Sequence, residues 1–254
     1  MSIIEDIYSL DEDRTQLLYR GENAEIRQFH QYRWLNLDGD LIQSIMDLEQ
    51  PARLLNPVNI YMLTALAFTT NLSSVLNLGF GGGVFERFFR HYCPEIQLHS
   101  VESNETVIHL AREFFDIDPD YPVYLQPAEK FVSEVDAAYG LILCDIFSQE
   151  HHPDCLYHDA FYRDCQRCLD EDGLMVVNLV TDTEEKLLEV LLPLRKSFAY
   201  SCLLEIPHHN NILVFSCRHD FLKRFDAESG AELDSRYGLD ISSQVSLLQP
   251  LPPR

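Results

Sequence analysis

Two segments of this sequence carry residues suited to chemistry on a nucleoside. Residues 79–83 read Gly-Phe-Gly-Gly-Gly and follow a mostly apolar run at 75–78. Glycine permits tight turns and lets the backbone approach a ligand without a Cβ in the way. Glu102 lies at the end of the next expected strand, about twenty residues on, where a carboxylate can accept hydrogen bonds from both ribose hydroxyls. Together these features predict a nucleoside-binding loop, and a purely structural turn is the alternative.

The glycine spacing separates two classes of nucleoside ligand. Dinucleotide sites use the spacing G-x-G-x-x-G, whereas residues 79–83 have the tighter spacing G-x-G-G-G. The tighter form is associated with ligands of the S-adenosylmethionine type. We therefore expect Gly79, Gly81 and Gly83 to contact an S-adenosyl group.

A third candidate is Asp145, which lies in a nearly continuous apolar run at 141–146. Such a run is typical of a parallel strand buried on both faces, and the carboxyl ends of these strands face the crevice where open α/β sheets bind ligands. A sulfonium makes its attached carbons electrophilic, and an amine attacks them only when it is deprotonated. A carboxylate beside the amine would help by accepting the proton. Asp145 is therefore a candidate general base, and a capping or loop aspartate is the alternative.

Alternating helices and strands would position these residues. We expect helices at 57–68, 83–92, 105–115, 159–169 and 183–195, and strands at 74–78, 96–101, 141–146, 173–180, 200–205 and 211–217. This alternation predicts an α/β fold of the Rossmann-like type, similar to class I methyltransferases, with a mostly parallel sheet covered on both faces. The last two strands suggest an antiparallel edge.

The first 55 residues differ and predict a small N-terminal β domain. Residues 25–37 and 41–46 alternate roughly between polar and apolar side chains, and Asp38-Gly39 between them is a hairpin-turn dipeptide. We place a β-hairpin domain at 1–55, a Rossmann-like domain at 56–220 and a C-terminal extension at 221–254. The tail from Gln249 is expected to fray.

Composition argues against several classes of protein and partner. The chain has 254 residues, 46% of them hydrophobic, and a formal net charge of −22. This charge repels phosphate backbones, so no nucleic-acid partner is expected; it attracts cations such as polyamines, although acidity that only maintains solubility also explains it. No apolar run reaches the length of a membrane span, and the start lacks a signal-peptide pattern. Seven scattered cysteines fit reduced thiols, so we expect a cytoplasmic protein without a membrane partner.

The histidines do not predict a metal site. His151, His152, His158, His208 and His209 have no convincing ligand frame with carboxylates or cysteines. Turn or surface histidines are the preferred interpretation, and no metal is expected.

Several segments together resemble the spermidine synthase (polyamine aminopropyltransferase) family. The matching segments occur in the family's order, at 33–43, 75–83, 100–103, 139–145 and 161–178. The resemblance implies a small N-terminal β domain on a Rossmann-like domain, usually in a homodimer. It also implies decarboxylated S-adenosylmethionine as the donor and a longer polyamine as the product. Gln43 would contact the nucleoside, Glu102 the ribose, and Asp145 would accept the proton or orient the attacking amine.

Four positions depart from the family pattern. Gly82 replaces an aspartate of the loop, and Ser148 replaces a second aspartate after the catalytic one. The adenine-contacting segment, typically glycine-aspartate-alanine, reads Gln-Pro-Ala and ends at Ala128. The tyrosine-histidine-glutamate stretch of the amine site reads Tyr-Met-Leu and keeps only Tyr61. We expect Ala128 to contact the cofactor, and Tyr61 and Ser148 to contact the substrate.

Most of these losses remove groups that bind positive nitrogen, so putrescine binding should be poor. Loss of the loop carboxylate also removes repulsion against the carboxylate of intact S-adenosylmethionine, which a helix N-terminus would favour. Three functions remain open. The first is aminopropyl or other alkyl transfer, from S-adenosylmethionine or its decarboxylated form, to an amine or another small nucleophile. The others are S-adenosylmethionine-dependent methyl transfer, and nucleoside binding without catalysis.

Overall fold

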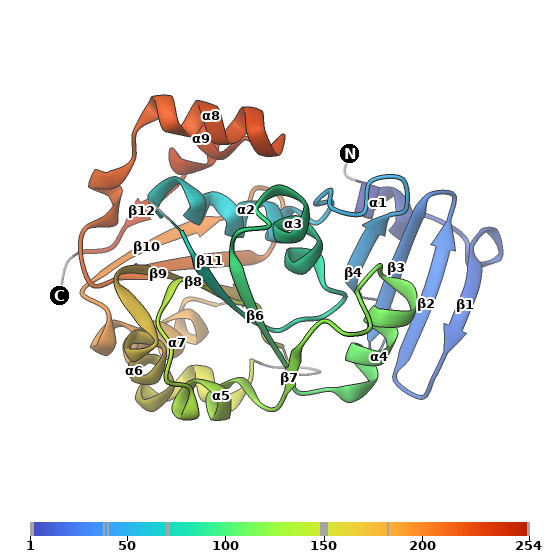
Figure 1. Ribbon diagram of the computed structural model, residues 1–254, viewed down its shortest axis with the longest axis horizontal. Coiled ribbons are helices and arrows are strands. Elements are labelled where there is room, and N and C mark those ends of the chain that lie inside the picture. Colours follow the sequence, from blue (N-terminus) through green and yellow to red (C-terminus); the bar gives the residue numbers. More distant parts are fainter. Residues whose placement is uncertain are drawn as a thin grey trace.

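The computed structural model describes residues 3–37, 39, 41–69, 72–147, 152–181 and 183–252. Within these residues the strands form two sheets, one of four strands near the N-terminus and one of eight strands in the rest of the chain. Figure 1 shows the smaller sheet, coloured blue, beside the larger sheet and its helices. The predicted α/β fold, with a mostly parallel sheet and a small N-terminal β unit, is confirmed.

The N-terminal sheet is antiparallel and follows the order of the sequence. Its strands are β1 (Gln16–Arg20), β2 (Ala24–Phe29), β3 (Tyr32–Leu37) and β4 (Ile42–Asp47). The prediction of a single arm at 25–37 is wrong, because a tight turn at His30, with φ of +52°, divides it into β2 and β3. Glycine and asparagine usually mark such turns, so this sequence carries no signal for it. Asp38, in the turn that we predicted, lies outside the described residues.

Apolar contacts on both faces hold this small sheet in place. Ile26 and Leu35 pack with Phe115 of the larger unit. The opposite face, which includes Trp34, is covered by helix α1 (Ile3–Tyr8). Burying one such side chain contributes about 1.5–3 kcal/mol, so a sheet too short to be stable alone is stabilised by its neighbours.

The larger sheet has the strand order β12-β10-β11-β9-β8-β5-β6-β7. Its parallel part consists of β5 (Ser74–Leu78), β6 (Gln97–Glu102), β7 (Val123–Leu125), β8 (Tyr139–Cys144) and β9 (Leu169–Val180). Strand β8 is central, between β5 and β9. The carboxyl ends of these strands meet at one edge, which brings the glycine loop, Glu102 and Asp145 together.

Helices cover both faces of the larger sheet. On one face lie α2 (Pro57–Met62), its 3-10 continuation Leu63–Phe68, and α3 (Val84–Tyr92); on the other lie α5 (Ala128–Glu134), α6 (Asp159–Arg167) and α7 (Glu184–Ser197). Helix α4 (Glu105–Phe114) packs between β6 and the N-terminal sheet. Asn56 caps α2 by accepting a hydrogen bond from the Val58 N–H. The sequence reading missed β7 and α5.

The antiparallel edge is also confirmed. Strand β11 (Asn211–Cys217) pairs with β9 and with β10 (Tyr200–Glu205) in antiparallel register. Figure 1 shows the C-terminal helices α8 (Ala227–Tyr237) and α9 (Ile241–Val245), in red, beside the α2 side of the sheet. Thr64, in the 3-10 turn, donates a hydrogen bond to Gln244 of α9 at 2.7 Å.

The tail after α9 is held by the sheet. Residues Gln249–Pro250 form β12, which pairs with β10, and the Leu251 N–H donates to the Ser201 carbonyl at 2.9 Å. The expectation that the tail frays from Gln249 is therefore wrong. No helix of the described part of the chain is both long and apolar enough to cross a membrane.

Candidate functional site

The glycine loop leaves β5 and enters α3 directly, as predicted. Gly79, Gly81 and Gly83 have φ values of +97°, +53° and +72°, a backbone conformation that other residues rarely adopt. A Cβ at Gly79 would overlap the Asp145 carbonyl oxygen and lie 2.8 Å from its carbonyl carbon. A Cβ at Gly81 would meet no atom within 4 Å. The loop therefore packs tightly on the end of β8 at Gly79 and leaves space for a ligand or a side chain at Gly81.

Glu102, the last residue of β6, aims its carboxylate at this loop. Its Oε2 accepts a hydrogen bond from the Gly81 N–H at 3.2 Å. Its Oε1 accepts from the Ser103 and Asn104 N–H groups at 2.9 and 3.0 Å. The side chain is half-buried, and of its roughly four lone-pair sites the one that remains, on Oε2, is available for a sugar hydroxyl. The structure thus brings together the loop and the acid that the sequence paired.

Ser44 of β4 contacts the loop, and sequence reasoning did not find it. A Cβ at Gly82 would lie 2.7 Å from the Ser44 Cβ, so position 82 has no room for the aspartate that we aligned there. Position 81 is open, and a carboxylate that extends from the loop would have to start there. Gln43 is exposed and lies at a register shift of β4, between Ile42, which pairs with Asn36, and Ser44, which pairs with Leu35. Its contact with a nucleoside stays a prediction.

A buried cation lies behind the loop. Arg87 is 2% exposed and donates from Nε to the Pro51 carbonyl at 2.8 Å. Its Nη1 donates to the carbonyl of Gly82 and, at 2.9 Å, to that of Phe115. Burial lowers the pKa of Arg87 to about 10, so the guanidinium stays charged at neutral pH. The charge holds the Gly82 carbonyl in place and links the loop to the segment after the N-terminal sheet.

Asp145 directly follows β8, and two amides support its carboxylate. Asn178 of β9 donates from Nδ2 to Asp145 Oδ1 at 2.8 Å. Asn211 of β11 donates from Nδ2 to Asn178 Oδ1 at 3.0 Å. Burial raises the pKa of Asp145, and the hydrogen bond from Asn178, which favours the charged form, opposes that rise. A carboxyl with a raised pKa is suited to take up a proton from a reacting group.

Two further predicted site residues, Ala128 and Tyr61, lie on helices that pack on the larger sheet. Ala128 is the buried first residue of α5, beside the end of β6. Tyr61 lies on α2, which packs on β9 and β11, and burial together with the charge of Asp240 raises its pKa. Ser148 lies outside the described residues. The ligand contacts of Ala128, Tyr61 and Ser148 stay predictions.

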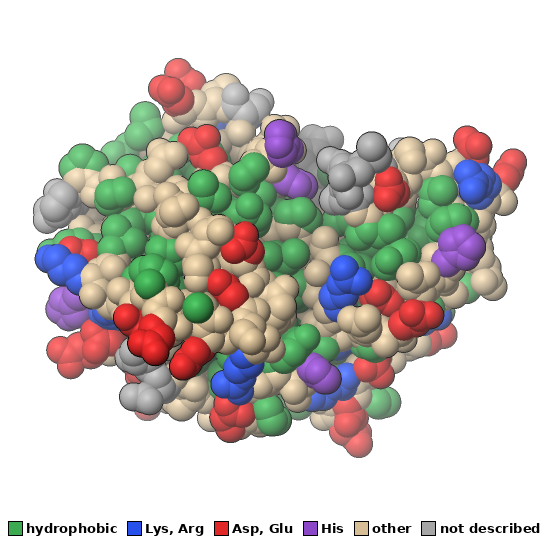
Figure 2. All heavy atoms as spheres, turned by 90° about the horizontal axis from the view of Figure 1, so that it is seen from above, with side chains coloured by type: hydrophobic (Ala, Val, Ile, Leu, Met, Phe, Trp, Pro, Cys, Tyr) green, Lys and Arg blue, Asp and Glu red, His purple; other side chains and the backbone are tan. Residues whose placement is uncertain are grey.

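Two further observations concern metals and nucleic acid. In the part of the chain that the structure describes, no group of three His, Cys, Asp or Glu side chains could hold a metal ion. Figure 2 shows one face of the molecule, where acidic side chains are widespread and basic side chains lie apart from one another. That face has no basic stripe of the kind that binds a phosphate backbone.

A buried acid lies between α3 and the sheet. Glu86 accepts hydrogen bonds at Oε1 from Asn77 at 2.8 Å and from Ser100 at 2.6 Å. The Ser100 hydroxyl is also hydrogen-bonded to the Tyr121 hydroxyl, at 2.9 Å. Burial raises the pKa of Glu86, and the hydrogen bonds from Ser100 and Asn77 oppose the rise without cancelling it. Ionising this carboxyl therefore destabilises the folded chain.

The substitution Glu86→Gln is expected to flatten the pH dependence of stability. Because the folded chain holds this proton to a higher pH than the unfolded chain, stability is fully present below the unfolded pKa and falls as pH rises through the folded pKa. The variant should gain about 1–2 kcal/mol in unfolding free energy over the native protein as the pH rises from 4 to 8. Urea unfolding of both proteins between pH 4 and 8 measures this difference in unfolding free energy. Glu134→Gln, at an exposed position, is the control, and equal pH slopes for Glu86→Gln and the native protein would contradict the expectation.

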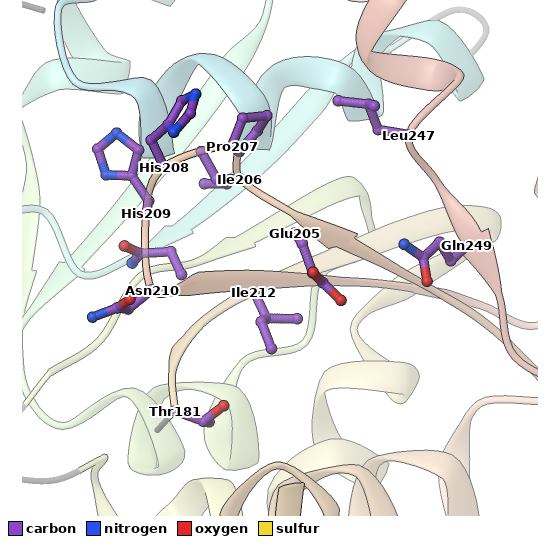
Figure 3. Close-up of a pocket in the computed structure, with 11 residues that line it drawn as sticks. Thr181, Glu205, Ile206, Pro207, His208, His209, Asn210, Ile212, Leu247 and Gln249 are labelled. Carbon is purple, nitrogen blue, oxygen red and sulfur yellow. The ribbon is translucent and has the colours of Figure 1, made fainter. Parts of the chain in front are cut away.

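A cavity of about 520 Å³ lies at the β10–β11 hairpin, at the edge of the sheet that carries Asp145. Figure 3 shows His208 and His209 on the hairpin turn and Glu205 at the end of β10. Asn211 also lines the cavity, and its amide is the one that donates to Asn178. The cavity is therefore connected to Asp145 by two side-chain amides.

Comparisons with known proteins show which family the chain belongs to. The family model described as the spermine/spermidine synthase domain matches residues 61–208. The chain is 30% identical over 251 residues to a polyamine aminopropyltransferase of Neisseria meningitidis, covering 90% of this chain and 88% of that protein.

Solved structures show how widely the fold is shared. A probable spermidine synthase from Corynebacterium glutamicum superposes with a TM-score of 0.72 at 20% identity, over 94% of this chain and 90% of that chain. Human methyltransferase-like protein 13 in complex with SAH has a TM-score of 0.62 at 19% identity, over 78% of this chain and 94% of that chain. Because both kinds of protein share the fold, the fold alone does not choose between them. The sequence comparisons do choose: this chain belongs to the spermine/spermidine synthase family.

Proposed function

We propose that this chain transfers an aminopropyl group from decarboxylated S-adenosylmethionine to a small amine. The family supports the reaction class, since relatives matched over most of their length are described as polyamine aminopropyltransferases. One observation carries the proposal. The main chain at Gly79 touches that of Asp145 so closely that a Cβ would overlap it. A donor held at the glycine loop therefore lies beside the proposed base.

The loop would take the adenosyl part of the donor, with Glu102 Oε2 accepting a hydrogen bond from a ribose hydroxyl. The acceptor nitrogen then attacks the aminopropyl carbon that is bound to sulfur. A C–N bond forms, the C–S bond breaks, and its electron pair stays on sulfur, which leaves methylthioadenosine. The proton lost by the amine passes to Asp145. Burial, which raises the pKa of Asp145, makes that carboxylate a better base than an exposed one.

The cavity at the β10–β11 hairpin is the proposed acceptor site. Its volume of about 520 Å³ lies within the usual range for small-molecule sites. Glu205 supplies a carboxylate to the lining, which would attract an ammonium at the far end of an extended amine. Asn211 would lie along the middle of the bound amine, between the ammonium near Glu205 and the attacking nitrogen beside Asp145.

A transfer assay tests the proposal. The protein is incubated with decarboxylated S-adenosylmethionine and a panel of diamines and longer polyamines, and methylthioadenosine is quantified by chromatography. We expect release that depends on both the donor and an amine. A methylated amine formed from intact S-adenosylmethionine would instead establish methyl transfer. Thermal stabilisation by either nucleoside without any product would indicate a binding protein.

The substitution Gly81→Asp is expected to strengthen binding of the decarboxylated donor. Position 81 has open space around a Cβ, and aspartate tolerates its φ of +53° better than most residues do. The new carboxylate could pair with the aminopropyl ammonium and lower the Kd about tenfold, while repelling the carboxylate of the intact donor. Calorimetric titration with both donors measures this. Gly81→Asn, of the same shape without the charge, is the control, and equal changes for both donors would refute the assignment.

A further inference from the structure

Three side chains form a hydrogen-bonded row across the centre of the larger sheet. Asp145 follows β8, Asn178 lies in β9, and Asn211 begins β11, so neighbouring strands supply successive members. The two hydrogen bonds measure 2.8 and 3.0 Å. Asn178, in the middle, is only 3% exposed. Its amide group therefore has these two protein partners in place of bulk water.

The direction of the row follows from the chemistry of its members. An ionised carboxylate only accepts hydrogen bonds, whereas an amide has a donor end and an acceptor end. If Asp145 is ionised, Asn178 must turn its Nδ2 toward it, and its Oδ1 then needs a donor on the other side. Asn211 is that donor. With the amide of Asn178 reversed, its Oδ1 would face Asp145, and only a protonated carboxyl could donate to it.

We propose that Asn178 and Asn211 are positioning residues that hold the Asp145 carboxylate in its ionised, acceptor-ready form, Asn211 acting through Asn178. The role of Asp145 as a base rests on the proposed function, whereas the orientation of the row does not. Asn211 lines the hairpin cavity, so the row connects the proposed acceptor site with the proposed base. The second carboxylate oxygen of Asp145, Oδ2, would take the proton of the amine.

The neighbours of Asp145 that are described below carry no charge. The hydrogen bond from the row is therefore the main interaction that favours the ionised carboxylate. The Gly79 main chain from β5 and the Asn178 amide from β9 are uncharged. Cys144, the preceding residue on β8, stays protonated because burial raises the pKa of its thiol. Burial, which raises the pKa of Asp145, is thus opposed by the hydrogen bond from Asn178.

A double-mutant cycle tests the proposal through the titration of Asp145 itself. Carboxyl-¹³C NMR of the unliganded full chain follows the Asp145 signal with pH, and the signal is assigned by its loss in Asp145→Asn. Asn178→Leu should raise the pKa of Asp145 by about one unit, the usual scale of a hydrogen bond to a charged group. Asn211→Leu should raise it by a smaller amount. In the Asn178→Leu background, Asn211→Leu should have no further effect, because its partner is absent.

A matched control removes another buried amide. Asn77 is fully buried in β5 and donates to the Glu86 carboxylate at 2.8 Å. Asn77→Leu should leave the pKa of Asp145 unchanged, which separates the row from general loosening of the sheet. Asn211 is half-buried, so Asn211→Leu keeps the test available if Asn178→Leu does not fold.

The outcomes are distinct. An unmoved pKa of Asp145 in Asn178→Leu or Asn211→Leu overturns the proposal, as does an Asn211→Leu shift of equal size in both backgrounds. The transfer assay is run alongside, and the acid limb of its pH profile should move with the NMR value. If the NMR shifts occur but no donor and amine give product, the row stands and the transferase function falls. If transfer occurs without the shifts, the function stands and the row falls.

Discussion

Replacing Asp145 by Asn is expected to abolish aminopropyl transfer while leaving donor binding intact. The amide keeps the shape of the carboxyl but cannot accept a proton from the attacking amine. General-base catalysis is worth about 10²–10⁴ in rate, so kcat should fall by that factor. The donor contacts at the glycine loop and Glu102 are untouched, so the thermal shift on donor binding should match that of the native protein.

Asp136→Asn is the matched control for this substitution. Asp136 is exposed and lies just before β8, at the opposite end of the strand from Asp145. The control should transfer at the native rate. A kcat within tenfold of the native value in Asp145→Asn would remove Asp145 from the role of base. Loss of donor binding in that variant would mean that Asp145 holds the donor rather than the proton.

Replacing Gly79 by Ala is expected to have the largest effect on stability. The new methyl would overlap the Asp145 carbonyl oxygen, which is main chain and cannot swing away, and the φ of +97° is unfavourable for alanine. Steric overlap and backbone strain together should cost about 3 kcal/mol or more. The loop and the end of β8 would be pushed apart, so donor affinity should fall as well.

Gly81→Ala is the natural comparison for Gly79→Ala. It has the backbone strain of a positive φ, +53°, but its methyl would meet no atom within 4 Å. Its cost should be about 1 kcal/mol. Urea unfolding of both variants, with calorimetric titration of the donor, measures the difference. Equal losses of stability in the two variants would show that backbone strain accounts for the cost, and that the overlap with the Asp145 carbonyl adds nothing to it.

Local patterns in the sequence predicted most of the larger fold. The apolar runs that became β5, β8 and the second half of β9 are buried on both faces, which leaves a clear signal in a single segment. The N-terminal sheet was harder to predict. Its turn at His30 contains no glycine or proline, and β1 is largely exposed, so neither has a local marker.

Some residues of the candidate site could be predicted from the sequence, and others could not. The glycine loop, Glu102 and Asp145 stand beside recognisable strands, so their chemistry could be predicted. Ser44, Asn178 and Asn211 could not, because each acts on a segment far away in the sequence and near it only in the folded sheet. The space at each glycine of the loop could not be predicted for a similar reason. Which glycine has space for a side chain depends on Ser44, which belongs to the other sheet.

The buried guanidinium behind the glycine loop limits which segments of this protein could be exchanged by recombination during evolution. Arg87 takes carbonyl partners from Pro51, Gly82 and Phe115, three separate stretches of the chain. Exchanging the N-terminal sheet for another module would remove one partner and leave a cation poorly solvated in the interior, a cost of several kcal/mol. A successful recombination would have to carry the loop and the linker together, so the two segments should be inherited as one unit.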